Sequence, residues 1–368
     1  MNITKNGTPL KLVAFFLIAA MLVFTVGFAS NGWQSSIPDS SVDSLGGTND
    51  NIDNGGSSPT DTTLPALKPT PEYIDYLTGL ETTKEAYFLP YIAFSMRSDS
   101  SLYGISNSAL TIELPTENGQ TRFLSYINNA HAIDKIGSLA PTRDYISCVS
   151  AFFSNYLAFN GNDDSFEYEI KDSGLTGPNF ASNSGYSYTE YTEFVFTNGA
   201  LIEAYFKSTQ DTASTSASTS ASPTLPFVFG SVTTSGSDAV SVRIPYSESN
   251  TTELIYSAGS ERYMLSKGGS LLTDRLNDKR LEYDNVFLLF CDSVTYETMS
   301  ATETILDTDG SGIGYYLSRG KMVSFTWSVD ASGNLTFLNS NGEVLLVNPG
   351  SSYIAYAKSS MVKSITFS

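Results

Sequence analysis

The sequence predicts an α+β fold, in which a mixed α/β N-terminal domain is followed by a β-rich C-terminal domain. Hydrophobic residues make up 41% of the 368 residues, a fraction too high for a wholly disordered chain. Apolar residues recur at helical spacing in the first half, whereas short strand-like runs separated by turn residues dominate the second half. A Ser/Thr/Ala-rich linker or loop, residues 209–224, separates two stretches of ordinary domain size.

The first segment, residues 1–29, has the pattern of a signal peptide or a membrane anchor. Lysines precede an uncharged apolar run from Leu12 to Phe28. A signal peptide cleaved after Ala29 fits the small residues that end the run. An uncleaved anchor would need about 20 apolar residues to span a bilayer, and it would make the membrane a partner of the chain. Both alternatives place the remainder outside the cytoplasm, because the positive flank stays inside.

Residues 30–64 form a polar, acidic stretch rich in Ser, Gly and Thr. Such a composition cannot bury enough surface to offset the entropy of ordering, so we expect a disordered tether. Together with the export segment, it predicts a folded unit that is held at the cell surface or secreted. No cysteine follows the apolar run directly, so lipid attachment through a lipobox cysteine is not available.

The first folded half, residues 65–208, carries strand signals before its helices. Apolar runs predict strands at Tyr91–Met96, Ala109–Leu114 and Thr121–Ile127. The polar segment Glu117–Gln120 supplies a turn before the third of these strands.

Two helices are predicted in the same half. The first covers Thr142–Phe159, with Thr142 as its N-cap. Its apolar side chains are expected to face the core, and they are Tyr145, Val149, Phe152, Phe153 and Tyr156. The second helix is predicted over Ala200–Lys207.

The second folded half, residues 225–368, reads mainly as strands separated by turn residues. The predicted strands are Ala239–Tyr246, Asn285–Phe290, Met322–Ser328, Leu335–Asn339 and Val344–Val347. The continuous apolar run of Asn285–Phe290 predicts a strand that is covered on both faces.

Composition excludes several classes of function. The formal net charge is −18, and no basic patch is visible, so nucleic acid is not an expected partner. One histidine and two cysteines exclude zinc sites built on Cys/His spacing. Asp307–Gly312 resembles half of a calcium loop, but its twelfth position is Ser318 rather than a carboxylate. We therefore expect no metal and no cofactor, and His131 is interpreted as a surface residue.

The cysteines leave two alternatives open. Cys148 is predicted on the apolar face of the first helix, and Cys291 ends the apolar strand run. In an exported protein they could form a disulfide that joins the two halves. Their apolar neighbours suit two inert buried thiols equally well.

Each half of the chain carries its own set of short motifs. In the first half they are Tyr76–Leu80 (YLTGL), Pro115–Phe123 (PTENGQTRF) and Gly137–Arg143 (GSLAPTR). In the second half they are Tyr246-Ser247, Arg262-Tyr263, Asn285-Val286, Gly320–Ser328 and Leu346–Ile354. Together these motifs resemble the YerB-like lipoproteins of Gram-positive bacteria, over most of residues 72–358.

The resemblance implies an extracytoplasmic, surface-tethered domain pair of unknown function in the cell envelope, with residues 65–208 and 225–368 as its two parts. It implies a structural role for the motif residues Gly79, Tyr246, Asn285, Trp327, Asn348, Pro349 and Gly350. The chain departs from the family pattern because it lacks the lipobox, one family arginine and a His-Asn element. It is therefore a divergent member, and the family has no established activity to carry over.

The polar residues of the first-half motifs are the candidate ligand-binding site. They are Glu113, Glu117, Arg122 and Arg143, to which we add the neighbouring Asp144. Arg143 is expected in the first turn of the predicted helix, where an arginine can hold a carboxylate or phosphate in a bidentate pair. The alternative is a structural network of Arg–Glu pairs between strand and helix.

The sequence thus predicts a non-catalytic binding module for a cell-wall fragment or another envelope protein. The alternative is an envelope hydrolase that uses Glu113 or Glu117 as general acid or base. A third hypothesis is an assembly protein whose second half docks onto a membrane partner, which an exposed apolar patch would support. No catalytic residue can be assigned from the sequence.

Overall fold

The computed structural model describes residues 71–87, 89–99, 101–161, 175–212, 225–230, 236–297 and 302–368. The predicted export segment and tether, residues 1–64, and most of the linker, residues 213–224, lie outside the described residues. Within the described ranges, none of the helices has the length and apolar character required to cross a membrane. Residues 68–368 form one compact unit.

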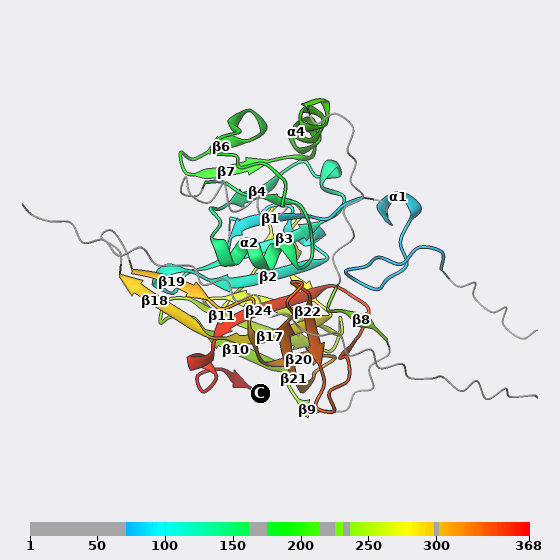
Figure 1. Ribbon diagram of the computed structural model, residues 1–368, viewed down its shortest axis with the longest axis vertical. Helices are drawn as coiled ribbons and strands as arrows, with labels where there is room; N and C mark the ends of the chain where they lie inside the picture. The colour runs from blue at the N-terminus through cyan, green and yellow to red at the C-terminus, as the bar shows by residue number, and fades with distance from the viewer. Residues whose placement is uncertain are drawn as a thin grey trace, which may run out of the picture. The chain divides into compact units, whose positions relative to one another are not determined.

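One large sheet runs through this unit, and thirteen of the described strands belong to it (Figure 1). Its strand order is β22 (Leu335–Leu338), β21 (Lys321–Val329), β20 (Ser311–Ser318), β17 (Asn285–Cys291), β24 (Ser352–Lys358), β2 (Leu110–Pro115), β3 (Thr121–Ile127), β1 (Ile92–Arg97), β4 (Ile136–Leu139), β7 (Phe194–Thr197) and β6 (Tyr188–Glu190). β5 (Leu157–Ala158) pairs with β1, and β9 (Ser237–Asp238) pairs with β21.

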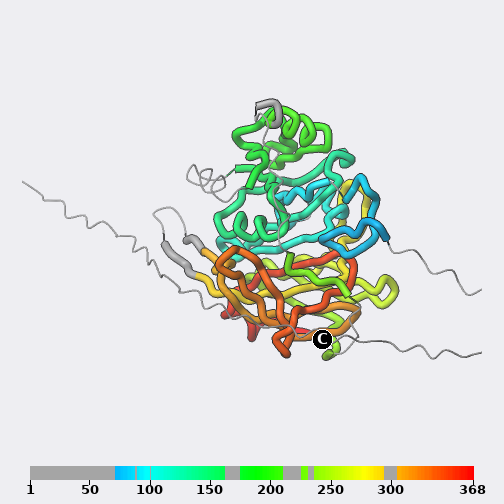
Figure 2. The backbone as a smooth tube through the Cα atoms, turned by 45° about the vertical axis from the view of Figure 1, so that its right-hand side comes forward, coloured from blue at the N-terminus to red at the C-terminus, as the bar shows by residue number. Residues whose placement is uncertain are grey.

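The two predicted halves share this sheet. The last long strand, β24, lies parallel to both β17 and β2, with Ile354 opposite Ile112. Figure 2 shows the red β24 segment directly beside the cyan strands of the first half. Strands from both predicted halves therefore meet in one sheet.

A second sheet covers one face of the first. Its order is β13 (Ser270–Leu271), β12 (Arg262–Lys267), β11 (Thr251–Ser257), β10 (Ser241–Pro245) and β25 (Thr366–Phe367), with β16 (Glu282–Tyr283) paired to β12. Three small ladders complete the described strands: β14 (Thr273–Asp274) with β15 (Lys279–Arg280), β18 (Ser293–Glu297) with β19 (Thr302–Leu306), and β8 (Val228–Phe229) with β23 (Leu346–Val347).

Helices are few in the described part of the chain. The α-helices are α1 (Lys84–Tyr87), α2 (Asp144–Ala151) and α4 (Gly199–Thr212). The 3-10 turns are η1 (Ile105–Asn107), η2 (Glu117–Gly119), η3 (Ala130–Ala132), η4 (Ser184–Tyr186) and η5 (Ser359–Met361). The protein is thus strand-rich, which supports the β-rich part of the predicted fold class.

Two hydrophobic cores lie on the two faces of the large sheet, because successive side chains of a strand point to opposite sides. On one face, Phe94 and Phe123 pack with Leu254 and Leu265 of the second sheet. On the other face, Leu124 and Tyr126 of β3 belong to the core that contains the apolar side chains of α2. As predicted, β17 is buried along its whole length.

The predicted helix Thr142–Phe159 is wrong in extent. α2 ends at Ala151, and its N-cap is Arg143 rather than Thr142, without a side-chain capping bond. Beyond it, the Ser154 hydroxyl bonds to the Tyr91 carbonyl and accepts the Tyr156 N–H at 2.9 Å. This serine offers the backbone an alternative to the helix, and Leu157–Ala158 then joins the sheet as β5.

Candidate functional site

Four of the five predicted ligand-binding residues fall into two clusters on opposite faces of the large sheet. In the β2–β3 pair, Glu113 lies opposite Phe123, whereas Arg122 lies opposite Leu114. Neighbouring positions of a strand face opposite sides, so Glu113 points toward the second sheet and Arg122 away from it. The outer arginine cluster comprises Arg97, Asp99, Glu117, Arg122 and Arg143. The inner cluster comprises Glu113, Thr121, Thr252, Lys267 and Tyr353.

The outer arginine cluster begins with a pair of cross-strand neighbours. Arg97 of β1 is the register partner of Arg122 of β3, so the two side chains share one face of the sheet. Arg97 is engaged elsewhere: its Nε lies 2.6 Å from the Asp99 carboxylate, and its guanidinium lies 4.9 Å from the centre of the Phe194 ring. These contacts fix Arg97 beside Arg122 without neutralising Arg122.

Arg143 is also engaged, in a bidentate pair with Glu117. Its Nε and Nη2 atoms donate to the two carboxylate oxygens at 2.8 and 3.1 Å, and its Nη1 donates to the Thr142 carbonyl at 2.7 Å. Burial alone would raise the pKa of Glu117, but the hydrogen bonds and charge of Arg143 outweigh burial and lower that pKa. Glu117 is therefore a bound carboxylate at neutral pH, which does not suit a general acid.

Arg122 differs from its two neighbours. The half-buried guanidinium donates from Nη1 to the Thr121 carbonyl at 3.1 Å, and it forms no ion pair with any acid of the described residues. Burial and the charges of Arg143 and Arg97 lower the pKa of Arg122. An arginine nevertheless stays protonated in proteins and offers five N–H donors. Most of the Arg122 donors are therefore available to an anion.

Asp144 stands apart from the arginines. It is exposed at the start of α2, where a carboxylate complements the helix dipole. Arg143, expected inside the first turn, is instead the N-cap residue.

The inner cluster surrounds Glu113, whose side chain is 0% exposed. Its Oε1 atom accepts hydrogen bonds from Lys267 Nζ at 2.6 Å, Thr121 Oγ1 at 2.8 Å and Thr252 Oγ1 at 3.0 Å. The Tyr353 hydroxyl donates to Oε2 at 2.5 Å. Burial, together with the charge of Glu113, raises the pKa of Tyr353 well above its usual value, which keeps the phenol a neutral donor.

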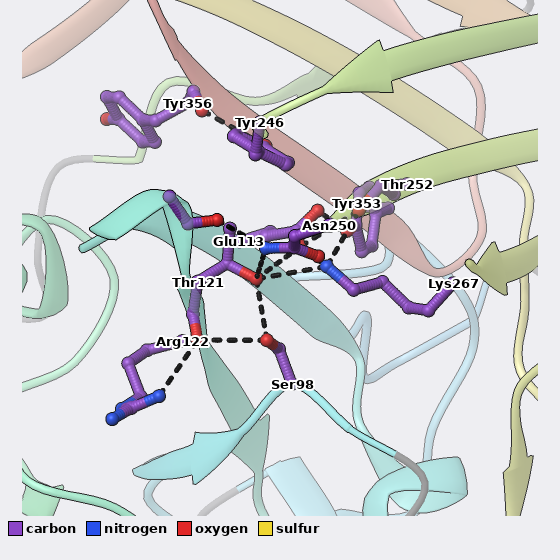
Figure 3. Close-up of polar contacts among 11 residues, drawn as sticks. Ser98, Glu113, Thr121, Arg122, Tyr246, Asn250, Thr252, Lys267, Tyr353 and Tyr356 are labelled. Carbon is purple, nitrogen blue, oxygen red and sulfur yellow. Dashed lines mark hydrogen bonds and ion pairs between the residues drawn. The ribbon is translucent and has the colours of Figure 1, made fainter. Parts of the chain in front are cut away.

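Thr121 joins the two clusters (Figure 3). Its carbonyl accepts from Arg122 Nη1 and from the Ser98 hydroxyl, while its own hydroxyl bonds to Glu113 and to Lys267 Nζ. The Asn250 amide, from the loop before β11, donates to the Gly119 carbonyl in η2 at 2.8 Å. The turn that carries Glu117 is therefore held by the second sheet.

The sequence did not point to Lys267, Thr252 or Tyr353. Each lies more than 130 residues from Glu113 along the chain, as the separations of 154, 139 and 240 residues show. The one available signal was an acidic residue inside the apolar run LTIEL, because a fully buried carboxylate requires a partner.

The motif residues of the second half meet in a separate polar network. The Asn285 amide donates to the Asn348 carbonyl at 2.8 Å and accepts from the Tyr316 hydroxyl at 2.8 Å. The Gly350 N–H donates to the Thr78 carbonyl at 2.7 Å, so the last motif contacts the first.

Three further motif residues lie inside the fold. A Cβ on Gly79, which has a positive φ of 64°, would lie 2.3 Å from the Phe229 ring. Trp327 Nε1 donates to the Phe290 carbonyl at 3.1 Å, and the Tyr246 hydroxyl donates to the Tyr356 carbonyl at 3.1 Å.

The remaining candidate groups lie apart from both clusters. Cys291 is buried, but Cys148 is exposed, so its predicted place on the apolar face of the helix is wrong. The buried side of α2 is formed instead by Tyr145, Ile146 and Val149. His131 lies exposed in η3. In the described ranges, no three His, Cys, Asp or Glu side chains are grouped closely enough to hold a metal ion.

Comparisons with known proteins agree on one relationship. A family model described as the C-terminal domain of a protein of unknown function (DUF3048) matches residues 242–354. The chain is 22% identical over 303 residues to "Putative lipoprotein YerB" of Bacillus subtilis (strain 168), which covers 76% of this chain and 84% of that protein. The crystal structure of the YerB protein from Bacillus subtilis matches with a TM-score of 0.69 at 18% identity, over 81% of this chain and 100% of that chain.

Proposed function

Because the chain is a YerB-like protein, as its motifs predicted, we propose that it is a non-catalytic binding module of the bacterial cell envelope. It acts outside the cytoplasm, tethered through residues 1–64 or released from them by cleavage. Its outer arginine cluster binds a carboxylate or phosphate group of a cell-wall fragment. The name of the Bacillus subtilis relative, "Putative lipoprotein YerB", and the apolar run Leu12–Phe28 support the location.

The observation that carries this proposal is the guanidinium of Arg122. Arg97 forms an ion pair with Asp99, and Arg143 forms one with Glu117. Arg122 therefore keeps its positive charge without a carboxylate partner among the described residues. A half-buried charge without a partner is costly. A bidentate carboxylate or phosphate would satisfy both the charge and the spare N–H donors.

The surroundings of Arg122 are already fixed before any ligand arrives. β1 and β3 hold Arg97 and Arg122 in register, and Glu117 orients Arg143. The Thr121 carbonyl accepts from Arg122 itself and from Ser98. Preorganisation of this kind reduces the ordering cost of binding and favours recognition of one anionic group.

Neither candidate carboxylate favours the alternative of a hydrolase. Glu117 is held in a bidentate pair with a lowered pKa, and Glu113 is enclosed between two sheets with four donors. A general acid or base must reach the substrate within hydrogen-bond distance. Glu117 instead orients Arg143, and Glu113 joins the large sheet to the second sheet.

A thermal-shift titration of residues 30–368 with muropeptides and with inorganic phosphate tests the proposal. A ligand at a hundredfold excess over its Kd should stabilise the fold by about 2.7 kcal/mol. Arg122→Ala should abolish the shift, whereas Arg280→Ala, which removes an exposed arginine of β15, should leave it intact. Equal shifts in wild type and Arg122→Ala would place the binding site elsewhere, and no shift with any anion would reject anion binding.

A further inference from the structure

A hollow of about 430 Å³ lies where α4 packs against the ends of β1 and β3. It shares no residue with the outer arginine cluster. Its floor is formed by three buried side chains, Ile92, Ala130 and Ile202, and one wall is formed by Tyr156 and Phe206. The two rings meet edge to face with their centres 5.4 Å apart. The hollow therefore presents an apolar floor beside an aromatic corner.

The hollow depends on how closely α4 approaches η3. The N–H of Gly199, the first residue of α4, donates to the Ile133 carbonyl at 2.8 Å. A Cβ at Gly199 would lie 2.0 Å from the His131 carbonyl oxygen, so only glycine permits this approach. The helix is thereby fixed as a wall at a set distance from the end of β3.

The rim carries two polar side chains that make no hydrogen bond among the described residues, Asn128 and the exposed His131, and two charges that cancel. Asn128, directly after β3, is half-buried, and its side-chain amide makes no hydrogen bond among the described residues. Glu203 and Lys207, one turn apart on α4, form an ion pair of 2.6 Å. An amide without a partner can donate and accept, whereas the paired charges give a charged ligand no net attraction.

We propose that this hollow is a binding site for an uncharged small molecule, or an uncharged end group of a larger one, with an aromatic or branched apolar body and one amide or hydroxyl group. The apolar body lies against Ile202 and the Tyr156–Phe206 corner, and the polar group bonds to Asn128. The volume is in the range of small-molecule sites, which are mostly apolar with a few placed polar groups. The site is distinct from the anion site of the proposed function.

N-acetyl-L-phenylalaninamide is a suitable probe, because it is uncharged and combines an aromatic ring with amide groups. Binding to residues 30–368 is measured by saturation-transfer NMR and titration calorimetry. Asn128→Ala should weaken binding by about threefold to tenfold, the effect of one hydrogen bond. Asn129→Ala, which removes the adjacent exposed amide outside the hollow, should leave the affinity unchanged.

Three results would overturn the proposal: no saturation transfer to the neutral probe, equal affinity in Asn128→Ala and wild type, or tighter binding of 3-phenylpropionate than of the amide. Asn128 makes no hydrogen bond within the described part of the chain, so its substitution should not unfold the protein, and circular dichroism checks this. Arg122→Ala should bind the probe as wild type does. The proposal of an anion site and the proposal of this neutral binding site can therefore be rejected independently of each other.

Discussion

Glu113 of β2 and Lys267 of β12 form an ion pair of 2.6 Å between the two sheets, although they are 154 residues apart in the chain. The carboxylate is 0% exposed and the lysine side chain 10% exposed, so water screens this pair very little. The hydroxyls of Thr121 and Thr252 each bond to both partners. The pair therefore joins the large sheet to the second sheet at one defined register.

Replacement of Glu113 by Gln should lower the free energy of unfolding by about 3–5 kcal/mol, because Lys267 would remain buried without its counter-ion. Urea unfolding followed by tryptophan fluorescence measures the loss. The matched control is Glu253→Gln in β11, a half-exposed carboxylate for which the structure gives no ion pair.

A double variant separates the ion pair from a simple packing effect. Glu113→Gln combined with Lys267→Met should be less destabilised than the sum of the two single variants, because it leaves no isolated buried charge. Strict additivity of the two losses would contradict the role given to the pair.

Tyr316→Phe should destabilise the protein by about 1–3 kcal/mol through the network of motif residues. Its hydroxyl donates to Asn285 Oδ1 at 2.8 Å and accepts the Asn348 N–H at 3.0 Å, and both partners are buried. Loss of the hydroxyl leaves each with one unmet hydrogen bond. Tyr315→Phe is the control, because that neighbouring hydroxyl makes no hydrogen bond among the described residues; equal stability of both variants would show that the network is dispensable.

Local sequence patterns predicted the strands that consist of a continuous run of apolar or strand-forming residues. The run NVFLLF indicated a fully covered strand, and β3 has the predicted bounds Thr121–Ile127. The helix prediction failed after Ala151, because the short continuous apolar run Tyr156–Phe159 suits a buried β-strand such as β5 equally well. The strand β24 was not predicted, although its apolar residues are buried between β17 and β2.

The candidate site could be predicted only in part. The motifs Pro115–Phe123 and Gly137–Arg143 did identify residues that lie together, since the Glu117–Arg143 pair is bidentate and Arg122 lies beside it. Glu113, four positions before Glu117, belongs to the opposite face of the sheet. Three of its four partners, Thr252, Lys267 and Tyr353, come from strands far along the chain, and no local spacing encodes such contacts.

The Glu117–Arg143 pair should make stability depend on acid pH. The folded-state pKa of Glu117 lies below its ordinary value of 4.5, so the unfolded chain binds its proton first as the pH falls. The contribution of the pair to the free energy of unfolding is then complete above about pH 5. It is lost as the pH falls below 4.5 toward the folded-state pKa of Glu117.

Because Arg143 is 39% exposed, Glu117→Gln should cost no more than about 1 kcal/mol at pH 7. Urea unfolding of wild type and Glu117→Gln at a series of pH values between about 3 and 7 tests this dependence. The difference in stability between the two proteins should shrink as the pH falls. A difference that is constant with pH would mean that the charge of Glu117 contributes nothing.

The two cysteines should react with alkylating agents at very different rates. Cys148 is exposed on α2, whereas Cys291 is buried in β17, where burial raises the pKa of its thiol to about 12. The thiolate is the reactive form, so at pH 8 Cys291 is both inaccessible and almost fully protonated. Iodoacetamide should add one label to the native protein, at Cys148, and a second label only in denaturant. Mass spectrometry counts the labels, Cys148→Ser should reduce the native count to zero, and labelling of native Cys291 would show that β17 opens to solvent.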